Sequence, residues 1–120
     1  MTTETGSIQA RSFDVPDETR NVSGMARIEV LSLGELTAVR ATMQPGFHWT
    51  EHARPVAGTD LCQAHHVGYV VSGGARVRLA DGTEREVSAG DIFDVPPGHD
   101  MWVIGDEPYV SIELDRGGNR

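Results

Sequence analysis

The sequence contains no lysine and a single cysteine, Cys62, among its 120 residues. One cysteine excludes a disulfide within the chain, so stability has to come from a packed core, a bound metal or a second subunit. A reducing cytoplasm is the expected setting. The chain carries 10 basic residues, all arginine, against 18 acidic ones, for a formal net charge of −8. This balance argues against nucleic acid as a partner, because phosphate binding needs clustered positive charge.

Long apolar runs are also missing. No stretch approaches the ~20 apolar residues of a membrane-spanning helix, and residues 1–10 lack the basic and apolar regions of a signal peptide. We therefore expect an unexported protein with no membrane partner, acting on a small molecule. A chain of 120 residues has room for one domain with its own core. We divide it into an N-terminal arm, residues 1–12, and a domain, residues 13–120.

What the chain does contain is a series of short β-type segments separated by turn residues. In residues 75–79, apolar side chains alternate with Arg76 and Arg78, which is typical of a strand with one buried face. The Asp81-Gly82 pair predicts a tight hairpin turn, and no helical period of any length occurs. The pattern predicts an all-β antiparallel barrel or sandwich. Strands are expected at 27–33, 36–43, 47–53, 65–71, 75–79, 83–87, 92–95, 101–104 and 109–114.

One histidine, His99, stands between two turns at the start of a predicted strand. The run Pro96-Pro97-Gly98 ends the preceding strand and turns the chain. Alternation then places His99, Met101 and Val103 on one face. An imidazole on an apolar face beside a turn suggests a ligand.

This segment resembles the second signature of the cupin superfamily, in which Gly, five residues, Pro, one residue and Gly precede a histidine. Gly90, Pro96 and Gly98 match this pattern, whereas the family's histidine position is Met101. His99 lies two residues earlier on the same face of the predicted strand. The resemblance therefore assigns the ligand role to His99.

The first cupin signature is matched in part. Gly46 is followed after five residues by His52, and counting back from Gly73 the family's glutamate position is His66. The second histidine of the family is missing or is replaced by Cys62. The resemblance covers residues 13–115 and extends to small, single-domain bacterial cupins. It implies a single-domain cupin β-barrel, also called a double-stranded β-helix or jelly roll.

The resemblance also implies a divalent metal, which would be iron, zinc, nickel or manganese. Its expected ligands are three histidines from different strands, His52, His66 and His99. Cys62 is either a fourth ligand or a small buried apolar residue. Three further residues are expected to support a ligand or line the pocket: Asp60, His48 and Met101.

The function implied by the resemblance is a metal-dependent enzyme acting on a small organic molecule, and the protein is expected to be a homodimer. Three histidines without a carboxylate resemble the thiol dioxygenase branch of cupins, which favours dioxygenase-like chemistry. Zinc, nickel or manganese would instead suit an isomerase or lyase. A third interpretation is a non-catalytic module that binds or senses a small ligand, with a structural metal or none. The fold alone does not choose among these.

Overall fold

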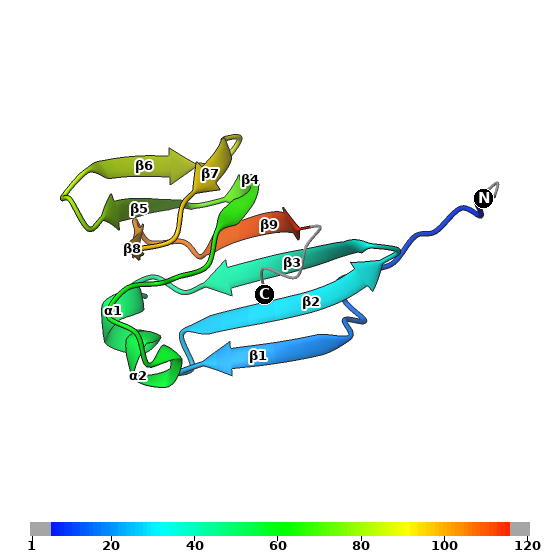
Figure 1. Cartoon of the computed structure of the whole chain (residues 1–120), viewed down its shortest axis with the longest axis horizontal. Coiled ribbons are helices and arrows are strands. Elements are labelled where there is room, and N and C mark those ends of the chain that lie inside the picture. Colours follow the sequence, from blue (N-terminus) through cyan, green and yellow to red (C-terminus); the bar gives the residue numbers. More distant parts are fainter. Residues whose placement is uncertain (1–5, 116–120) are drawn as a thin grey trace.

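The computed structural model describes residues 6–115, which are almost entirely β-structure (Figure 1). The all-β prediction is confirmed. Residues 1–5 of the predicted arm and 116–120 of the predicted domain lie outside the described residues. The elements in chain order are β1 (Glu18–Val22), β2 (Ala26–Leu33), β3 (Leu36–Met43), α1 (Trp49–His52), α2 (Arg54–Ala57), β4 (His66–Ser72), β5 (Gly74–Leu79), β6 (Glu84–Ser88), β7 (Ile92–Val95), β8 (His99–Ile104) and β9 (Tyr109–Asp115).

The strands form two antiparallel sheets. A six-stranded sheet has the order β1-β2-β3-β9-β4-β7, and a three-stranded sheet has the order β6-β5-β8. Sequence neighbours β2 and β3 form a hairpin, whereas β3 and β4 are both paired with β9 from the end of the chain. Strand β9 therefore holds the two halves of the larger sheet together, and it places residues near position 113 beside those near position 68.

The core lies between the two sheets. Its main cluster draws Val70 and Phe93 from the larger sheet and Ala75 and Val103 from the smaller one. Phe47, from the loop after β3, is 1% exposed within the same cluster. Strand β9 shows the two-residue period of a strand clearly, with Tyr109, Ser111 and Glu113 buried and the residues between them more exposed. The strand pattern read from the sequence thus reflects one buried face per sheet.

Residues 6–12 run away from the sheets in an extended path (Figure 1) and are exposed. This part of the predicted arm makes no strand. Arg11, near the end of this segment, forms an ion pair with Asp17 at 2.7 Å. Within residues 6–115, no helix has the length and apolar character needed to span a membrane.

The strand predicted at 47–53 is wrong. Trp49–His52 and Arg54–Ala57 are single helical turns, and Trp49 is buried. Pro55 lies in the first turn of α2, where its fixed φ and missing N–H are tolerated. Gly58, with φ of 78°, ends that turn in the left-handed conformation. The sequence analysis also missed the edge strand β1, whose exposed polar residues show little apolar alternation.

Gly68 allows β4 and β9 to approach closely. A Cβ at this position would lie 2.2 Å from the carbonyl oxygen of Ile112 and 3.0 Å from the Cα of Glu113. No such approach is tolerated by a real side chain, so an added methyl would force β9 to move. Gly68 is paired with Glu113 across the two strands, so the displacement would move the backbone of Glu113.

We therefore expect Gly68→Ala to lower the free energy of unfolding by about 1–3 kcal/mol, the usual cost of overpacking. Urea denaturation followed by circular dichroism measures this loss. Val67→Ala is the matched control, because Val67 is the preceding residue of β4 and is 40% exposed. Equal denaturation midpoints for the two variants would show that β9 accommodates the methyl group.

Candidate metal centre

Three residues that can bind a metal converge at one end of the interior: Cys62, His66 and His99. His66 is the first residue of β4 and His99 the first of β8. Cys62 lies in the loop between α2 and β4. Its backbone forms a bridge to His99, with the Cys62 N–H donating to the His99 carbonyl at 2.8 Å. The loop is thus fixed against β8 through its backbone.

The donor atoms of the three side chains all lie within 4.8 Å of one another. The Cys62 Sγ is 3.6 Å from the His66 Nε2. The rings of His66 and His99 are 5.1 Å apart and meet edge to face. The two imidazoles and the thiol therefore surround a common point.

Hydrogen bonds to the Nδ1 atoms orient both imidazoles. The His66 Nδ1 is 2.6 Å from Oε1 of Glu113, and the His99 Nδ1 is 2.7 Å from the carbonyl oxygen of Pro96. A carboxylate and a carbonyl can only accept, so each Nδ1 is the donor. This leaves Nε2 as the remaining nitrogen of each ring. The Nε2 of His66 faces Cys62, where it can share a proton with the sulfur or, after losing that proton, bind a metal. Such bonds typically fix the tautomer of histidines that bind metals.

The same surroundings change the acidity of Cys62. Burial raises the pKa of its thiol, but hydrogen bonds with His66, then His99, and with the backbone of Ala64 lower it further than burial raises it. The net effect brings the pKa from an ordinary 9.0 to about 6. The thiolate, which is the form that binds metals, therefore predominates at neutral pH.

The rate at which Cys62 is alkylated should depend on pH according to the pKa of its thiol. In metal-free protein, we expect the rate of reaction with iodoacetamide to rise as the pH passes the thiol pKa, with a midpoint near 6. His66→Ala should move the midpoint upward, because the thiolate loses a hydrogen bond. A wild-type midpoint near the ordinary value of 9.0 would contradict this account of the sulfur's environment.

The cluster lies in a cavity of about 260 Å³ between the two sheets, which is partly open to solvent. Cys62, His66, His99 and Glu113 form part of its wall, and Met101 also lines it. Most of the remaining lining is aliphatic or aromatic. A cavity of this kind, mostly apolar with a few convergent polar groups, is typical of a small-molecule site.

The donor set fits a divalent metal. With a zinc–sulfur distance of about 2.3 Å, a zinc–nitrogen distance of about 2.0 Å and a tetrahedral angle, the sulfur and nitrogen would be about 3.5 Å apart. The observed 3.6 Å between Cys62 and His66 is close to that value. A thiol of low pKa and two oriented imidazoles supply the deprotonated ligands that binding requires. The three residues thus form a possible metal-binding triad.

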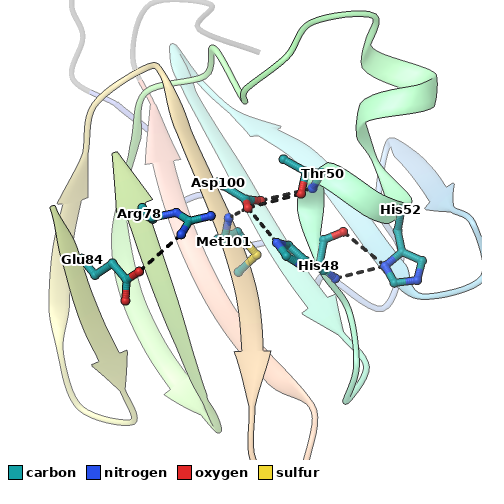
Figure 2. A network of polar contacts seen from close by, with 7 residues as sticks. All are labelled: His48, Thr50, His52, Arg78, Glu84, Asp100 and Met101. Carbon is teal, nitrogen blue, oxygen red and sulfur yellow. Dashed lines mark hydrogen bonds and ion pairs between the residues drawn. The ribbon is translucent and has the colours of Figure 1, made fainter. Parts of the chain in front are cut away.

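The structure does not bring His52 into this cluster. His52 is the last residue of α1, and its Nδ1 is 3.0 Å from the backbone nitrogen of His48. Its ring stacks on Phe47 with 5.6 Å between centroids, and its Nε2 is 3.4 Å from the carboxylate of Glu51. Figure 2 shows the imidazole on the far side of His48 from Asp100. The helical turn, in place of the expected strand, is the physical reason.

His48 belongs to a second polar network, centred on the buried Asp100 (Figure 2). The Asp100 carboxylate is 2.6 Å from the His48 Nε2 and accepts hydrogen bonds from the backbone N–H and the hydroxyl of Thr50. This network fixes α1 to β8. Asp60, expected to support a ligand, is exposed and lines a surface depression that includes Arg54 and Arg78.

Glu113 was not predicted. Its carboxylate is 9% exposed and contacts His66 from β9. The alternation of this strand points the other way, because its apolar face by sequence is Val110, Ile112 and Leu114. The structure instead buries the opposite face, Tyr109, Ser111 and Glu113, and both Tyr109 and Glu113 line the cavity. Local alternation therefore offers no signal for Glu113.

Solved structures show which fold this is. KdgF from Halomonas sp. is 23% identical, with 92% of each chain covered and a TM-score of 0.59. An RmlC-like cupin from Shewanella frigidimarina is 24% identical over 81% of this chain and 80% of that one, with a TM-score of 0.53. Oxalate decarboxylase from Bacillus subtilis is 24% identical over 84% of this chain, with a TM-score of 0.55, but this chain spans 27% of that protein.

These likenesses confirm the predicted cupin jelly roll. No protein-family model matches the sequence, and no curated protein matches it. The comparisons therefore establish the fold, while the reaction has to be argued from the residues of the cavity.

Proposed function

We propose that this cupin-fold chain is a metal-dependent enzyme that acts on a small organic molecule in its cavity. The observation that carries the proposal is the convergence of Cys62, His66 and His99 at the cavity wall. Three protein ligands leave a coordination position for water or substrate, as in catalytic zinc sites. The oxalate decarboxylase among the similar folds has Mn(II) centres, which supports the capacity of this fold to hold a divalent ion.

The protein's own residues would hold and shield the reacting centre. His66 and His99 would hold the metal through Nε2, while Glu113 and the Pro96 carbonyl keep both rings in place. A bound divalent ion supplies Lewis acidity and lowers the pKa of a coordinated water. The apolar walls limit the access of bulk water and strengthen electrostatic interactions inside the cavity.

The ligand set bears on the class of reaction. A set of three histidines favours dioxygenase-like chemistry, but the cluster has Cys62 where His52 is expected. One thiolate and two imidazoles suit zinc well. Isomerase or lyase chemistry is therefore our preferred assignment. An iron-dependent dioxygenase is the second candidate, because the same donors also bind iron.

The alternative function is non-catalytic: a module that binds or senses a small ligand without turnover. In such a protein the metal would be structural or absent. A structural zinc site is closed by four protein ligands, whereas the cluster in the described residues has three. A fourth coordination position left open for water or substrate favours an enzyme over a module with a structural metal.

The experiment that tests the proposal begins with protein purified without chelators and assayed for metal by plasma mass spectrometry. Metal-free, zinc-loaded, manganese-loaded and iron-loaded samples are then incubated with a panel of small hydroxy, keto and carboxylic acids. We expect a metal-dependent loss of one substrate that Cys62→Ala abolishes. Oxygen consumption would identify the dioxygenase. Stoichiometric metal with no conversion would favour the sensing module, and no metal after reconstitution would contradict the proposal.

A further inference from the structure

Arg20 brings positive charge to a cavity that is otherwise mostly apolar. It lies on β1 with Val22 on the same face, and both residues line the cavity. Strand β1 is one edge of the larger sheet, and the Arg20 side chain is 46% exposed. Among the described residues that line the cavity, Arg20 is the one arginine. It is therefore placed to meet a ligand entering from solvent.

The ion pair between Arg20 and Glu18 leaves some of the guanidinium N–H donors free. Glu18, two residues earlier on β1, engages the Nε and Nη2 atoms. This carboxylate is 49% exposed, and exposed ion pairs of this kind contribute little, about 0–1 kcal/mol. Within residues 6–115, no protein acceptor contacts the Nη1 atom. A guanidinium has five N–H donors in a planar fork, so Arg20 keeps donors for a second carboxylate.

The rest of the cavity sets the size and polarity of the ligand. A volume of about 260 Å³ corresponds to roughly nine water-sized groups, at about 30 Å³ each. Apart from the metal cluster, Glu113 and Arg20, no described residue of the lining has a charged side chain, and Tyr109 adds one hydroxyl. The lining consists largely of these apolar residues: Val22, Ile28, Val39, Met43, Phe47 and Phe93.

The two polar regions of the cavity lie on different strands of the larger sheet. Three strands, β2, β3 and β9, separate Arg20 on β1 from His66 on β4. With a divalent metal bound, its two positive charges are matched by the Cys62 thiolate and the Glu113 carboxylate. Arg20 is then the remaining charged group of the described cavity lining, and its partner Glu18 forms an exposed ion pair that contributes little. A ligand with a single negative charge complements this distribution.

We infer that the ligand of this cavity is a small, largely apolar monocarboxylate whose carboxylate binds Arg20. Arginine matches the planar geometry of a carboxylate with two parallel hydrogen bonds. The apolar body then fills the space between the sheets, and the opposite end of the molecule reaches the Cys62, His66 and His99 cluster. The inference rests on the proposed function, because it takes that cluster as the reacting end, and it makes Arg20 a residue that determines specificity.

Benzoate and its uncharged analogue benzamide test this inference by isothermal titration calorimetry on zinc-loaded protein. We expect benzoate to bind more tightly than benzamide. Arg20→Met keeps the aliphatic stem and removes the charge, so it should weaken benzoate binding about tenfold to a hundredfold, the range expected for lost hydrogen bonds to a charged group. It should leave benzamide binding and zinc content unchanged. Arg20→Lys keeps the charge and should recover part of the affinity.

Arg27→Met is the matched control, because Arg27 is exposed on the adjacent strand β2 and does not line the cavity. Equal benzoate affinity in wild type and Arg20→Met would overturn the inference, and so would a wild type that binds no benzoate. Binding lost in Cys62→Ala but kept in Arg20→Met would place the carboxylate at the metal, overturning the inference while leaving the proposed function intact. Arg20-dependent binding in a protein that takes up no zinc would support the Arg20 contact and contradict the metal-dependent enzyme.

Discussion

Replacing Cys62 by alanine is expected to abolish stoichiometric metal binding, whereas replacing His52 by alanine is expected to leave it intact. The Cys62 sulfur lies 3.6 Å from the His66 Nε2 and its backbone is bonded to His99. The His52 ring instead packs on Phe47 and contacts the backbone of His48. Mutating a residue that only hydrogen-bonds to a metal ligand typically lowers metal affinity about tenfold to a hundredfold. Removal of the ligand itself should cost more, so we expect Cys62→Ala to lower the affinity by more than about a hundredfold.

Metal content after dialysis against a fixed zinc concentration measures the difference. His66→Ala and His99→Ala should behave like Cys62→Ala, because each supplies one donor atom to the cluster. His52→Ala is the matched histidine control outside the cluster. Circular dichroism of the metal-free variants checks that each has folded. Metal retained by Cys62→Ala but lost from His52→Ala would overturn the triad and restore the three-histidine set.

Glu113→Ala is expected to lower metal affinity about tenfold to a hundredfold, although Glu113 is not one of the three proposed ligands. Its carboxylate accepts from the His66 Nδ1 at 2.6 Å and so fixes the ring with Nε2 toward Cys62. Without this partner, His66 can rotate or change tautomer. Glu113→Gln should lose less, because the amide oxygen still accepts the hydrogen bond while the charge is gone.

Competition with a chromophoric zinc chelator measures both Glu113 variants. Ser111→Ala is the control, because Ser111 is buried two residues earlier on β9 and does not line the cavity. If Glu113→Ala binds zinc as tightly as Ser111→Ala, the carboxylate has no part in orienting His66.

The strand pattern was predictable because each sheet buries one face. The two-residue alternation identified β2, β3 and the strands from β4 to β9 to within a few residues. Turn residues such as Pro97 and Gly98 marked where they end. The helical turns at Trp49–His52 and Arg54–Ala57 were not predictable in the same way. One turn is too short to show a helical period, and the alternation of His48, Thr50 and His52 imitates a strand.

Strand alternation predicted the positions of His66 and His99, whereas Cys62 was a possible ligand from the cupin resemblance alone. The alternation along β8 placed His99 and Met101 on the cavity face, and the predicted strand at 65–71 placed His66 there. Cys62 lies in a loop without periodicity, so only the bridge to His99 brings it to the cluster. The contact between His66 and Glu113 joins residues 47 positions apart, through the pairing of β4 with β9. Local sequence patterns carry no information about such a pairing.

X-ray absorption spectroscopy at the zinc edge of the zinc-loaded protein is the sharpest test of the metal site, because it counts the sulfur and nitrogen neighbours of the metal. We expect one sulfur at about 2.3 Å and two imidazole nitrogens at about 2.0–2.1 Å, with a further light atom from water. Loss of the sulfur shell in Cys62→Ala would identify its source. A spectrum with nitrogen and oxygen neighbours alone would contradict the triad of Cys62, His66 and His99.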